Sequence, residues 1–243
     1  LMASSLSAAS PDVLVLHERL RPTGEVTGPA AEKTVRWDPK RTALIVCDMW
    51  DDHWCRSASK RCDALAKAVA PVVEAARKQG VKRIVFASSN HVTGFYRQDE
   101  VVGLKDPARP DGLYGLSKAF GEDLSRFYFD RYGIETVCLR IGSSFPEPRN
   151  RRMLATWMSY DDLERLLIAS LTAPVVGHSI IYGMGDNTTT WWDNTLARHI
   201  GYRPQDSSEP FRAKIEAADP HPDMTDPAVI FQGGPFVRTG PFE

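Results

Sequence analysis

The sequence predicts an α/β fold in which a parallel sheet lies between two layers of helices. Two observations lead to this prediction: apolar runs typical of buried strands, and helical patterns that alternate with them. An apolar run at 42–50 is followed by a helical pattern at 63–80 and a second apolar run at 81–88. Strand, helix and strand with short connections form a right-handed βαβ unit, so we expect a three-layer parallel sheet.

The rest of the chain continues this alternation. The expected elements are a helix at 113–132, a strand at 134–142, a helix at 159–173, a strand at 178–183 and a short helix at 193–201. Gly133 is the expected stop of the first helix, and Ser159 with Asp162 forms a capping box on the second. The last forty residues are rich in proline and glycine, and we expect them to wrap the surface.

Two regions are expected along the chain. Residues 1–40 are rich in Ser, Pro, Gly and Thr, which predicts an irregular extension with at most a short strand at 13–16. Residues 41–243 are predicted to form a single α/β domain, made of a βα unit at 41–80 and a catalytic and substrate-binding part at 81–243.

Composition argues against several classes of partner. The formal net charge is -1, so no bulk attraction to nucleic acid or to an anionic membrane is implied. No apolar run approaches the ~20 residues that span a bilayer. The first ten residues lack the basic and apolar regions of a signal peptide. We therefore expect a cytoplasmic protein without a nucleic-acid or membrane partner.

The cysteines give little indication of a metal site. Cys47, Cys55 and Cys62 lie close to His53 in the sequence, and Cys138 lies far from them. No pair has the C-x2-C spacing that is common in zinc sites. Separate thiols in a reducing compartment are the preferred interpretation, and no metal is expected.

The motif that carries chemistry is the pair Tyr114 and Lys118. They are four residues apart in the expected helix 113–132, so the phenol and the ammonium lie one turn apart on one face. A free tyrosine ionises near pH ~10, and a nearby cation favours the phenolate. The pair is suited to general acid–base catalysis, although the same spacing also occurs by chance in structural helices.

Two further polar clusters directly follow predicted strands. Residues 88–91 (Ser-Ser-Asn-His) follow the strand 81–88, and residues 142–144 (Gly-Ser-Ser) follow the strand 134–142. Ligands of parallel α/β sheets bind outside the carboxyl ends of the strands. We therefore expect both clusters to meet Tyr114 at one edge of the sheet.

These residues resemble the extended short-chain dehydrogenase/reductase family, in which a strand ending in serine precedes a helix with YxxxK. Tyr114 follows Ser89 by 25 residues, a spacing typical of extended members. The stretches 86–97, 109–133 and 139–153 resemble the uronate-oxidising members, and the resemblance covers about residues 72–243. It implies a Rossmann-like fold with NAD as cofactor and leaves a homo-oligomer open, formed through an apolar face with Leu124, Phe127 and Phe129.

The resemblance also implies roles for individual residues. Tyr114 would be the catalytic acid/base, and Lys118 would lower its pKa; both would bind the cofactor at the nicotinamide ribose. Ser89 would be catalytic by hydrogen-bonding the substrate oxygen and Tyr114. The implied substrate-binding residues are Asn90, His91, Ser143 and Arg152, the last pairing its guanidinium with a substrate carboxylate.

The implied reaction oxidises the C1 hydroxyl of a uronic acid, glucuronate or galacturonate, to the aldarolactone with hydride transfer to NAD. Each residue also has a structural interpretation. Ser89, His91 and Ser143 suit loop or capping positions. Arg152 stands near other arginines, in what would otherwise be a solvated basic loop.

The first eighty residues depart from this family. They contain no GxGxxG or GxxGxxG, the fingerprint that binds a pyrophosphate at a helix N-terminus. Residues 11–80 instead resemble the start of an isochorismatase-like cysteine hydrolase, in which Asp48 matches the aspartate of an Asp-Lys-Cys set. We therefore expect a chimera whose usual dinucleotide-binding half is replaced. A cysteine hydrolase and a folded but inactive α/β protein are the alternatives.

Overall fold

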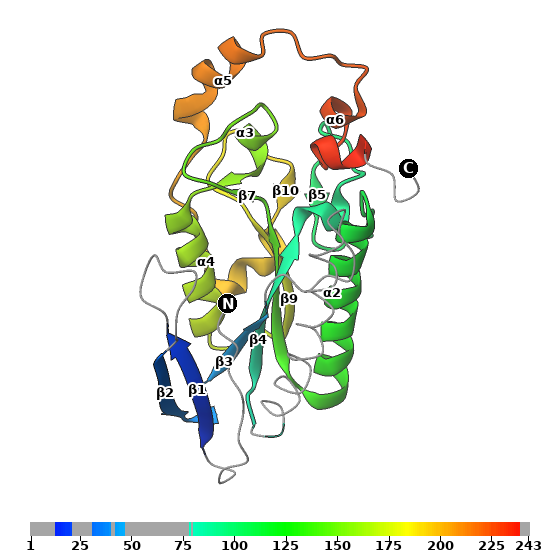
Figure 1. Ribbon diagram of the computed structural model, residues 1–243. Helices are drawn as coiled ribbons and strands as arrows, with labels where there is room; N and C mark the ends of the chain where they lie inside the picture. Colours follow the sequence, from blue (N-terminus) through cyan, green and yellow to red (C-terminus); the bar gives the residue numbers. More distant parts are fainter. Residues whose placement is uncertain (1–12, 21–30, 40–41, 47–77, 79, 239–243) are drawn as a thin grey trace.

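The computed structural model describes residues 13–20, 31–39, 42–46, 78 and 80–238 (Figure 1). The expected helix at 63–80 lies almost entirely outside the described residues. Asp48, His53 and the three cysteines that precede Cys138 also lie outside them.

A four-stranded parallel sheet forms the centre of the molecule. Its order is β3 (Ala43–Val46), β4 (Arg83–Ser89), β6 (Glu135–Ile141) and β9 (His178–Gly183). All three pairings are parallel. The strands expected from the apolar runs are therefore confirmed, and their parallel arrangement confirms the α/β class.

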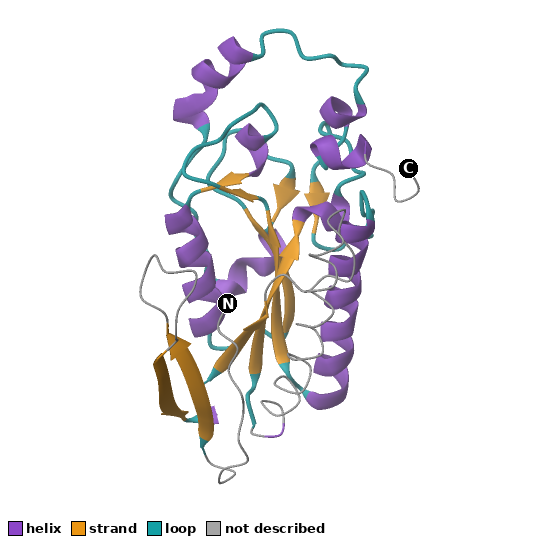
Figure 2. Ribbon diagram, viewed as in Figure 1, coloured by secondary structure: helices purple, strands orange, loops and turns teal. Residues whose placement is uncertain are grey.

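Two long helices cover opposite faces of this sheet, α2 (Leu113–Tyr132) and α4 (Tyr160–Thr172) (Figures 1 and 2). Side chains alternate between the two faces along a strand. Val85, Val137 and Leu139 pack with Leu166 of α4 in the main apolar core. The residues between them face α2, which gives the expected three layers.

Shorter elements surround the sheet. They are η2 (Asn90–Thr93), β5 (Val102–Gly103), β7 (Ser143–Ser144), α3 (Met153–Thr156), β8 (Trp157–Met158), β10 (Trp192–Asp193), η3 (Thr195–Ile200), η4 (Glu209–Phe211), α5 (Arg212–Ala218), α6 (Pro227–Ile230) and η5 (Gly234–Arg238). β5 pairs with β10 and β7 pairs with β8, both in parallel. Among the described helices, none combines the length and the apolar content needed to cross a bilayer.

The N-terminal forty residues contain more regular structure than expected. β1 (Leu14–Leu20) pairs antiparallel with β2 (Ala31–Trp37). The short strand considered at 13–16 is therefore part of a longer strand, and the prediction of irregular structure is wrong for residues 17–20 and for β2. Pairing supplies backbone partners to the polar residues 17–19 and 32–34, which show no apolar run of their own. Likewise, the expected helix at 193–201 is the 3-10 helix η3, and the C-terminal region contains α5, α6 and η5.

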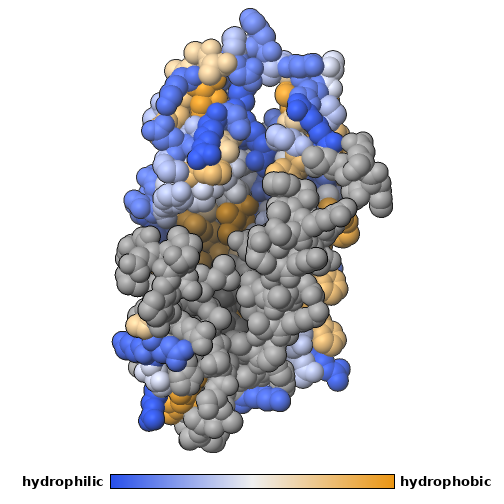
Figure 3. All heavy atoms as spheres, in the orientation of Figure 1, coloured by the Kyte–Doolittle hydropathy of each residue, from blue (hydrophilic) through white to orange (hydrophobic). Residues whose placement is uncertain are grey.

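Helix α2 has the expected bounds, but its apolar stripe faces outward. The exposed apolar side chains are Leu113, Leu116, Phe120, Leu124 and Phe127, and Figure 3 shows hydrophobic residues along the right-hand edge, where α2 runs. The buried residues of α2 are Gly115, Lys118 and Glu122. Phe129, expected on the exposed face, is half-buried. The helical period is therefore correct, whereas the face that meets the sheet is polar.

A buried row of polar residues on the sheet explains this inversion. Ser88, Arg140 and Tyr182 are cross-strand neighbours on β4, β6 and β9. Arg140 donates from Nε (3.0 Å) and Nη2 (2.8 Å) to Glu122, whose Oε1 also accepts from Ser88 at 2.6 Å. Burial opposes the charge of Arg140, but the hydrogen bonds and charge of Glu122 raise its pKa above the usual value.

We predict that Glu122→Ala lowers the free energy of unfolding by about 3–5 kcal/mol, because it leaves Arg140 as an unpaired buried charge. Urea unfolding followed by circular dichroism measures this. The control is Asp130→Ala, which removes the exposed pair of Arg126 and Asp130 on the same helix and should have little effect. Equal stability of the Glu122 variant and the unmodified chain would contradict a supporting role for the pair.

Candidate functional site

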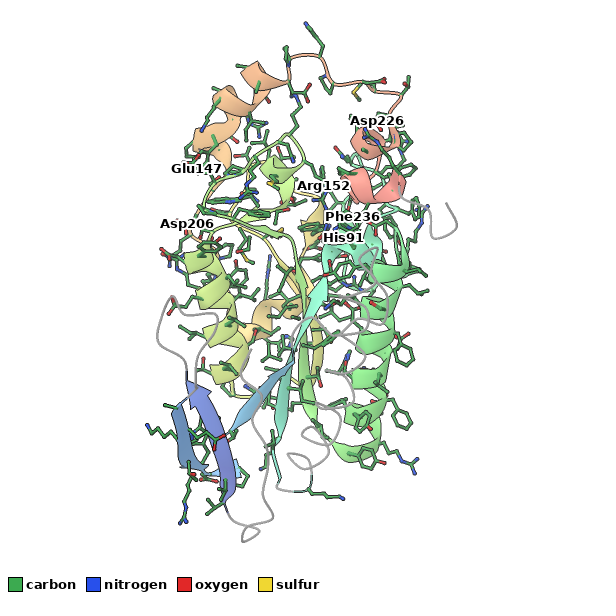
Figure 4. All side chains as sticks on the ribbon, viewed as in Figure 1. His91, Glu147, Arg152, Asp206, Asp226 and Phe236 are labelled. Carbon is green, nitrogen blue, oxygen red and sulfur yellow. The ribbon has the colours of Figure 1, made fainter. Side chains whose placement is uncertain are left out.

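The expected site residues gather where β4 and β6 end. Ser89 is the last residue of β4, and η2 begins at the next residue. Ser143 follows β6 after one residue. Figure 4 shows His91 and Arg152 near each other and near Phe236, which comes from η5 at the far end of the chain. The carboxyl edge of the sheet is therefore the candidate site, as the strand ends predicted.

The segment with Ser89, Asn90 and His91 is folded back against the start of α2. Ser89 caps η2, because its Oγ accepts from the backbone N–H of His91 at 3.2 Å. A side chain at Gly115 would overlap the carbonyl of His91, so glycine permits this close approach. Ser89 therefore has the capping role that the sequence also allowed. Its hydroxyl lies at the end of β4, next to the other candidate residues.

Tyr114 and Lys118 lie close to each other on α2, as their spacing predicted. Lys118 is fully buried, and its Nζ donates to the carbonyl of Ala87 at 2.9 Å. The same Nζ lies 5.5 Å from the centre of the Tyr114 ring. A buried ammonium thus lies beside the phenol, and a cation in that position favours the phenolate.

Arg152 connects the remaining expected residues. Its Nε donates to the carbonyl of Gln232 at 2.6 Å, and Nη1 lies 3.4 Å from Oγ of Ser143. With its amide oxygen toward the guanidinium, Asn90 accepts from Nη2 at 2.5 Å and donates to the Ile141 carbonyl at 3.1 Å. Arg152 is therefore held by backbone and side chains of separate segments and is not part of a solvated basic loop.

The charge of Arg152 suits an anion. Burial lowers the pKa of this guanidinium to about 10, and the negative charge of Asp111 opposes that shift. Arg152 therefore remains positive at neutral pH. The hydrogen-bond partners of the guanidinium are neutral, so its donors suit an added carboxylate.

Three residues of the site were missed from the sequence. His91 Nδ1 lies 2.5 Å from Oδ2 of Asp111, and the ring centres of His91 and Phe236 are 3.9 Å apart. Gln232 holds Arg152. Asp111 stands three residues before Tyr114, and this position could have indicated that it belongs to the site. Gln232 and Phe236 belong to a C-terminal segment without a recognisable motif.

Cys138, the one cysteine in the described part of the chain, is not placed as a nucleophile. It is buried within β6, and its Sγ lies 3.3 Å from Ser125 and 3.8 Å from Nε2 of His178. Burial, followed by the charge of Glu122, raises the pKa of this thiol to about 12. The thiol is therefore protonated at neutral pH. No group of three metal-ligating side chains occurs among the residues that the structure describes.

Comparisons with known proteins show which family the chain resembles. The model of the NAD dependent epimerase/dehydratase family matches residues 37–169. A uronate dehydrogenase of Pseudomonas syringae pv. tomato is 61% identical over 171 residues, covering 70% of this chain and 62% of the relative. A uronate dehydrogenase of Agrobacterium fabrum is 41% identical over 242 residues, covering 92% and 91%.

A solved structure shows the same relationship. A mutant uronate dehydrogenase of Agrobacterium tumefaciens, complexed with NAD, superposes with a TM-score of 0.68 at 49% identity, covering 72% of this chain and 66% of that one. The chain spans just under two thirds of the length of the first curated relatives that it matches. Its parallel sheet and helices have the Rossmann-like arrangement of these neighbours. Because the family model matches more than half of its length, the chain belongs to the NAD-dependent epimerase/dehydratase family.

Proposed function

We propose that this chain belongs to an NAD-dependent oxidoreductase that oxidises the C1 hydroxyl of a uronic acid, glucuronate or galacturonate, to the aldarolactone. One observation carries the proposal: a partly buried, positively charged Arg152 lies in the same site as the Tyr114–Lys118 pair. An anion site next to an acid–base pair suits a substrate with both a carboxylate and an oxidisable hydroxyl. The relatives named as uronate dehydrogenases support the same reaction.

The residues divide the chemistry between them. Tyr114, as phenolate, takes the proton of the C1 hydroxyl, and Lys118 stabilises that phenolate. Ser89 hydrogen-bonds the reacting oxygen. NAD, when bound, supplies the hydride acceptor for C1. Arg152 pairs with the carboxylate, so the sugar enters with C1 toward Tyr114.

Asn90, His91 and Ser143 complete the proposed substrate site. Asn90 and Ser143 both contact the guanidinium of Arg152, so they help to fix the carboxylate end. His91 lies between Asp111 and the ring of Phe236, and its ring centre is 5.7 Å from that of Tyr114. It is therefore placed near the reacting end of the sugar.

NAD would reach this site through its nicotinamide ribose. Tyr114 and Lys118 are the residues expected to hold the nicotinamide ribose, and the burial of Lys118 at the end of β4 fits that role. The glycine fingerprint for a pyrophosphate is absent from residues 1–80 of the sequence. Because the pyrophosphate site contributes much of the binding energy in such folds, we expect this chain to bind NAD weakly.

We predict NADH formation from glucuronate or galacturonate, and its loss by at least about 100-fold in Tyr114→Phe, because the proton acceptor is removed. Absorbance of NADH at increasing NAD concentration measures both rate and cofactor affinity. Saturation in the micromolar range would contradict weak cofactor binding. A folded chain that binds the sugar acid without forming NADH would instead favour the inactive alternative.

A second prediction concerns Arg152. Arg152→Gln keeps a polar side chain but removes the charge, so we expect the KM for glucuronate to rise about 10- to 100-fold, the effect of losing one charged hydrogen bond. The KM for a neutral aldose should change much less. Comparing the two substrates on one variant separates loss of the anion site from general damage. An equal rise for both sugars would count against the assigned role.

The hydrolase alternative rests on the resemblance of residues 11–80, of which Asp48 is the main feature. The match to the family model already includes residues 37–80, and Cys138 is buried and protonated. The chimeric origin and the hydrolase remain predictions from the sequence. Hydrolysis of an amide or vinyl ether that is abolished by a thiol alkylator would favour the hydrolase over the dehydrogenase.

The exposed apolar stripe of α2 is proposed as a surface for self-association. Leu116, Phe120 and Phe127 are each more than half exposed, and exposed apolar patches mark interaction sites. Phe129 does not belong to this stripe. Sedimentation of the chain as a single monomeric species at high concentration would exclude the proposal. The cytoplasmic location stays a prediction from the sequence.

A further inference from the structure

We infer that Asp111 is a positioning residue of the uronate site: it fixes the tautomer of His91 so that Nε2 accepts a hydrogen bond from a sugar hydroxyl. The inference rests on the proposed function. His91 Nδ1 lies 2.5 Å from Oδ2 of Asp111. The side chain of Asp111 is 0% exposed and that of His91 is 10% exposed, so water does not replace this contact.

The direction of this hydrogen bond determines the tautomer. A carboxylate accepts only, so Nδ1 of His91 carries the proton and donates it to Asp111. In the neutral imidazole the lone pair is then on Nε2. Among the described residues, Nε2 has no hydrogen-bond partner, and it is the ring atom that remains for a ligand. A hydroxyl of the sugar is a donor of the right kind.

Apart from the His91 side chain, the backbone at two glycines packs closely against the Asp111 carboxylate. A Cβ at Gly94 or at Gly233 would overlap the Asp111 carboxylate. Gly233 N–H donates to the Gly94 carbonyl at 2.8 Å, which joins the two segments around Asp111. Two segments more than 130 residues apart in the sequence therefore pack around this one side chain. This indicates that the fold specifies the position of the Asp111 carboxylate.

The imidazole is also held on its faces. The Phe236 ring lies 3.9 Å from the His91 ring, centre to centre, tilted by 31°. The Tyr114 ring meets it edge-on at 5.7 Å. Asp111 fixes one edge of the ring and the aromatic rings restrict its tilt, so Nε2 keeps one direction before a sugar arrives.

The surroundings of the Asp111 carboxylate show why it depends on the His91 N–H as a hydrogen-bond donor. Arg152 and Lys118 are the nearby cations of the site, and the charge of Asp111 favours the cationic form of Arg152. Oδ1 of Asp111 is buried without a hydrogen-bond partner in the described part of the chain. The His91 N–H is therefore the donor that compensates this buried carboxylate.

The test is Asp111→Asn, with glucuronate binding measured by calorimetry without NAD. The amide N–H₂ would donate to Nδ1 and shift the proton to Nε2, as Asp→Asn does to the histidine of a catalytic triad. We expect glucuronate affinity to fall at least about tenfold. In a His91→Ala background, Asp111→Asn should cause no further loss, because its effect passes through the imidazole.

The matched control is Asp162→Asn. Asp162 is equally buried, at 0% exposure, and accepts from Arg165 and from the backbone of Gln205 and Asp206, away from the site. This variant should lose stability but keep glucuronate affinity. A tenfold loss of affinity in both variants would overturn the inference, because buried carboxylates in general would then be responsible.

A spectroscopic measurement on the unmodified chain does not depend on folding of the variant. The ¹⁵N shifts of the His91 ring should show a protonated Nδ1 in the absence of sugar, and an Nε2-protonated ring would overturn the inference. If the unmodified chain binds glucuronate and Asp111→Asn binds it equally well, the inference fails and the proposed function stands. If the unmodified chain does not bind glucuronate, the proposed function fails.

Discussion

Glu122 and Arg140 form a buried ion pair between α2 and the middle of the sheet, and the position of the site depends on it. Glu122 stands one turn after Lys118, so the pair fixes the depth and rotation of the helix that carries Tyr114. An arginine only donates, so the hydrogen bond from Arg140 to the Tyr182 hydroxyl (2.9 Å) has one direction. Tyr182 must then donate onward to Thr93 at 3.1 Å, and Thr93 Oγ1 lies 3.3 Å from the Asn90 carbonyl. The ion pair therefore supports both α2, with Tyr114 and Lys118, and the segment with Asn90 and His91, which are proposed to bind the substrate.

The polar face of α2 also shows which parts of this fold the sequence can predict. The bounds of α2 and the order of buried strands follow from local periodicity, and Ser159 caps α4 as its position predicts, accepting from Asp162 N–H at 2.9 Å. The side of α2 that meets the sheet does not follow from periodicity. Its apolar residues are outside because Ser88, Arg140 and Tyr182, from three different strands, provide polar partners that only the assembled sheet brings together.

The site divides in the same way. Six of the seven expected residues lie together because they stand at strand ends and on α2, which are local features. Arg152 directly precedes α3 and was expected from the resemblance alone. Asp111, Gln232 and Phe236 act through contacts that span 20 residues or more, with no motif to indicate the partner. The pairing of β1 with β2 was missed for the same reason, since β2 is mostly polar and the paired residues are more than ten positions apart. Contacts between distant polar segments are the part of this structure that a single sequence does not reveal.

The contact between Arg152 and the Gln232 carbonyl has a consequence for the order in which the protein matures during synthesis. The ribosome makes the sheet, α2 and α4 well before residue 232, and domains begin to fold while the chain is still growing. A nascent chain can thus acquire its apolar core while Arg152 still lacks one of its holders and Phe236 does not yet cover His91. The anion site proposed at Arg152 is therefore completed late, after the scaffold already exists.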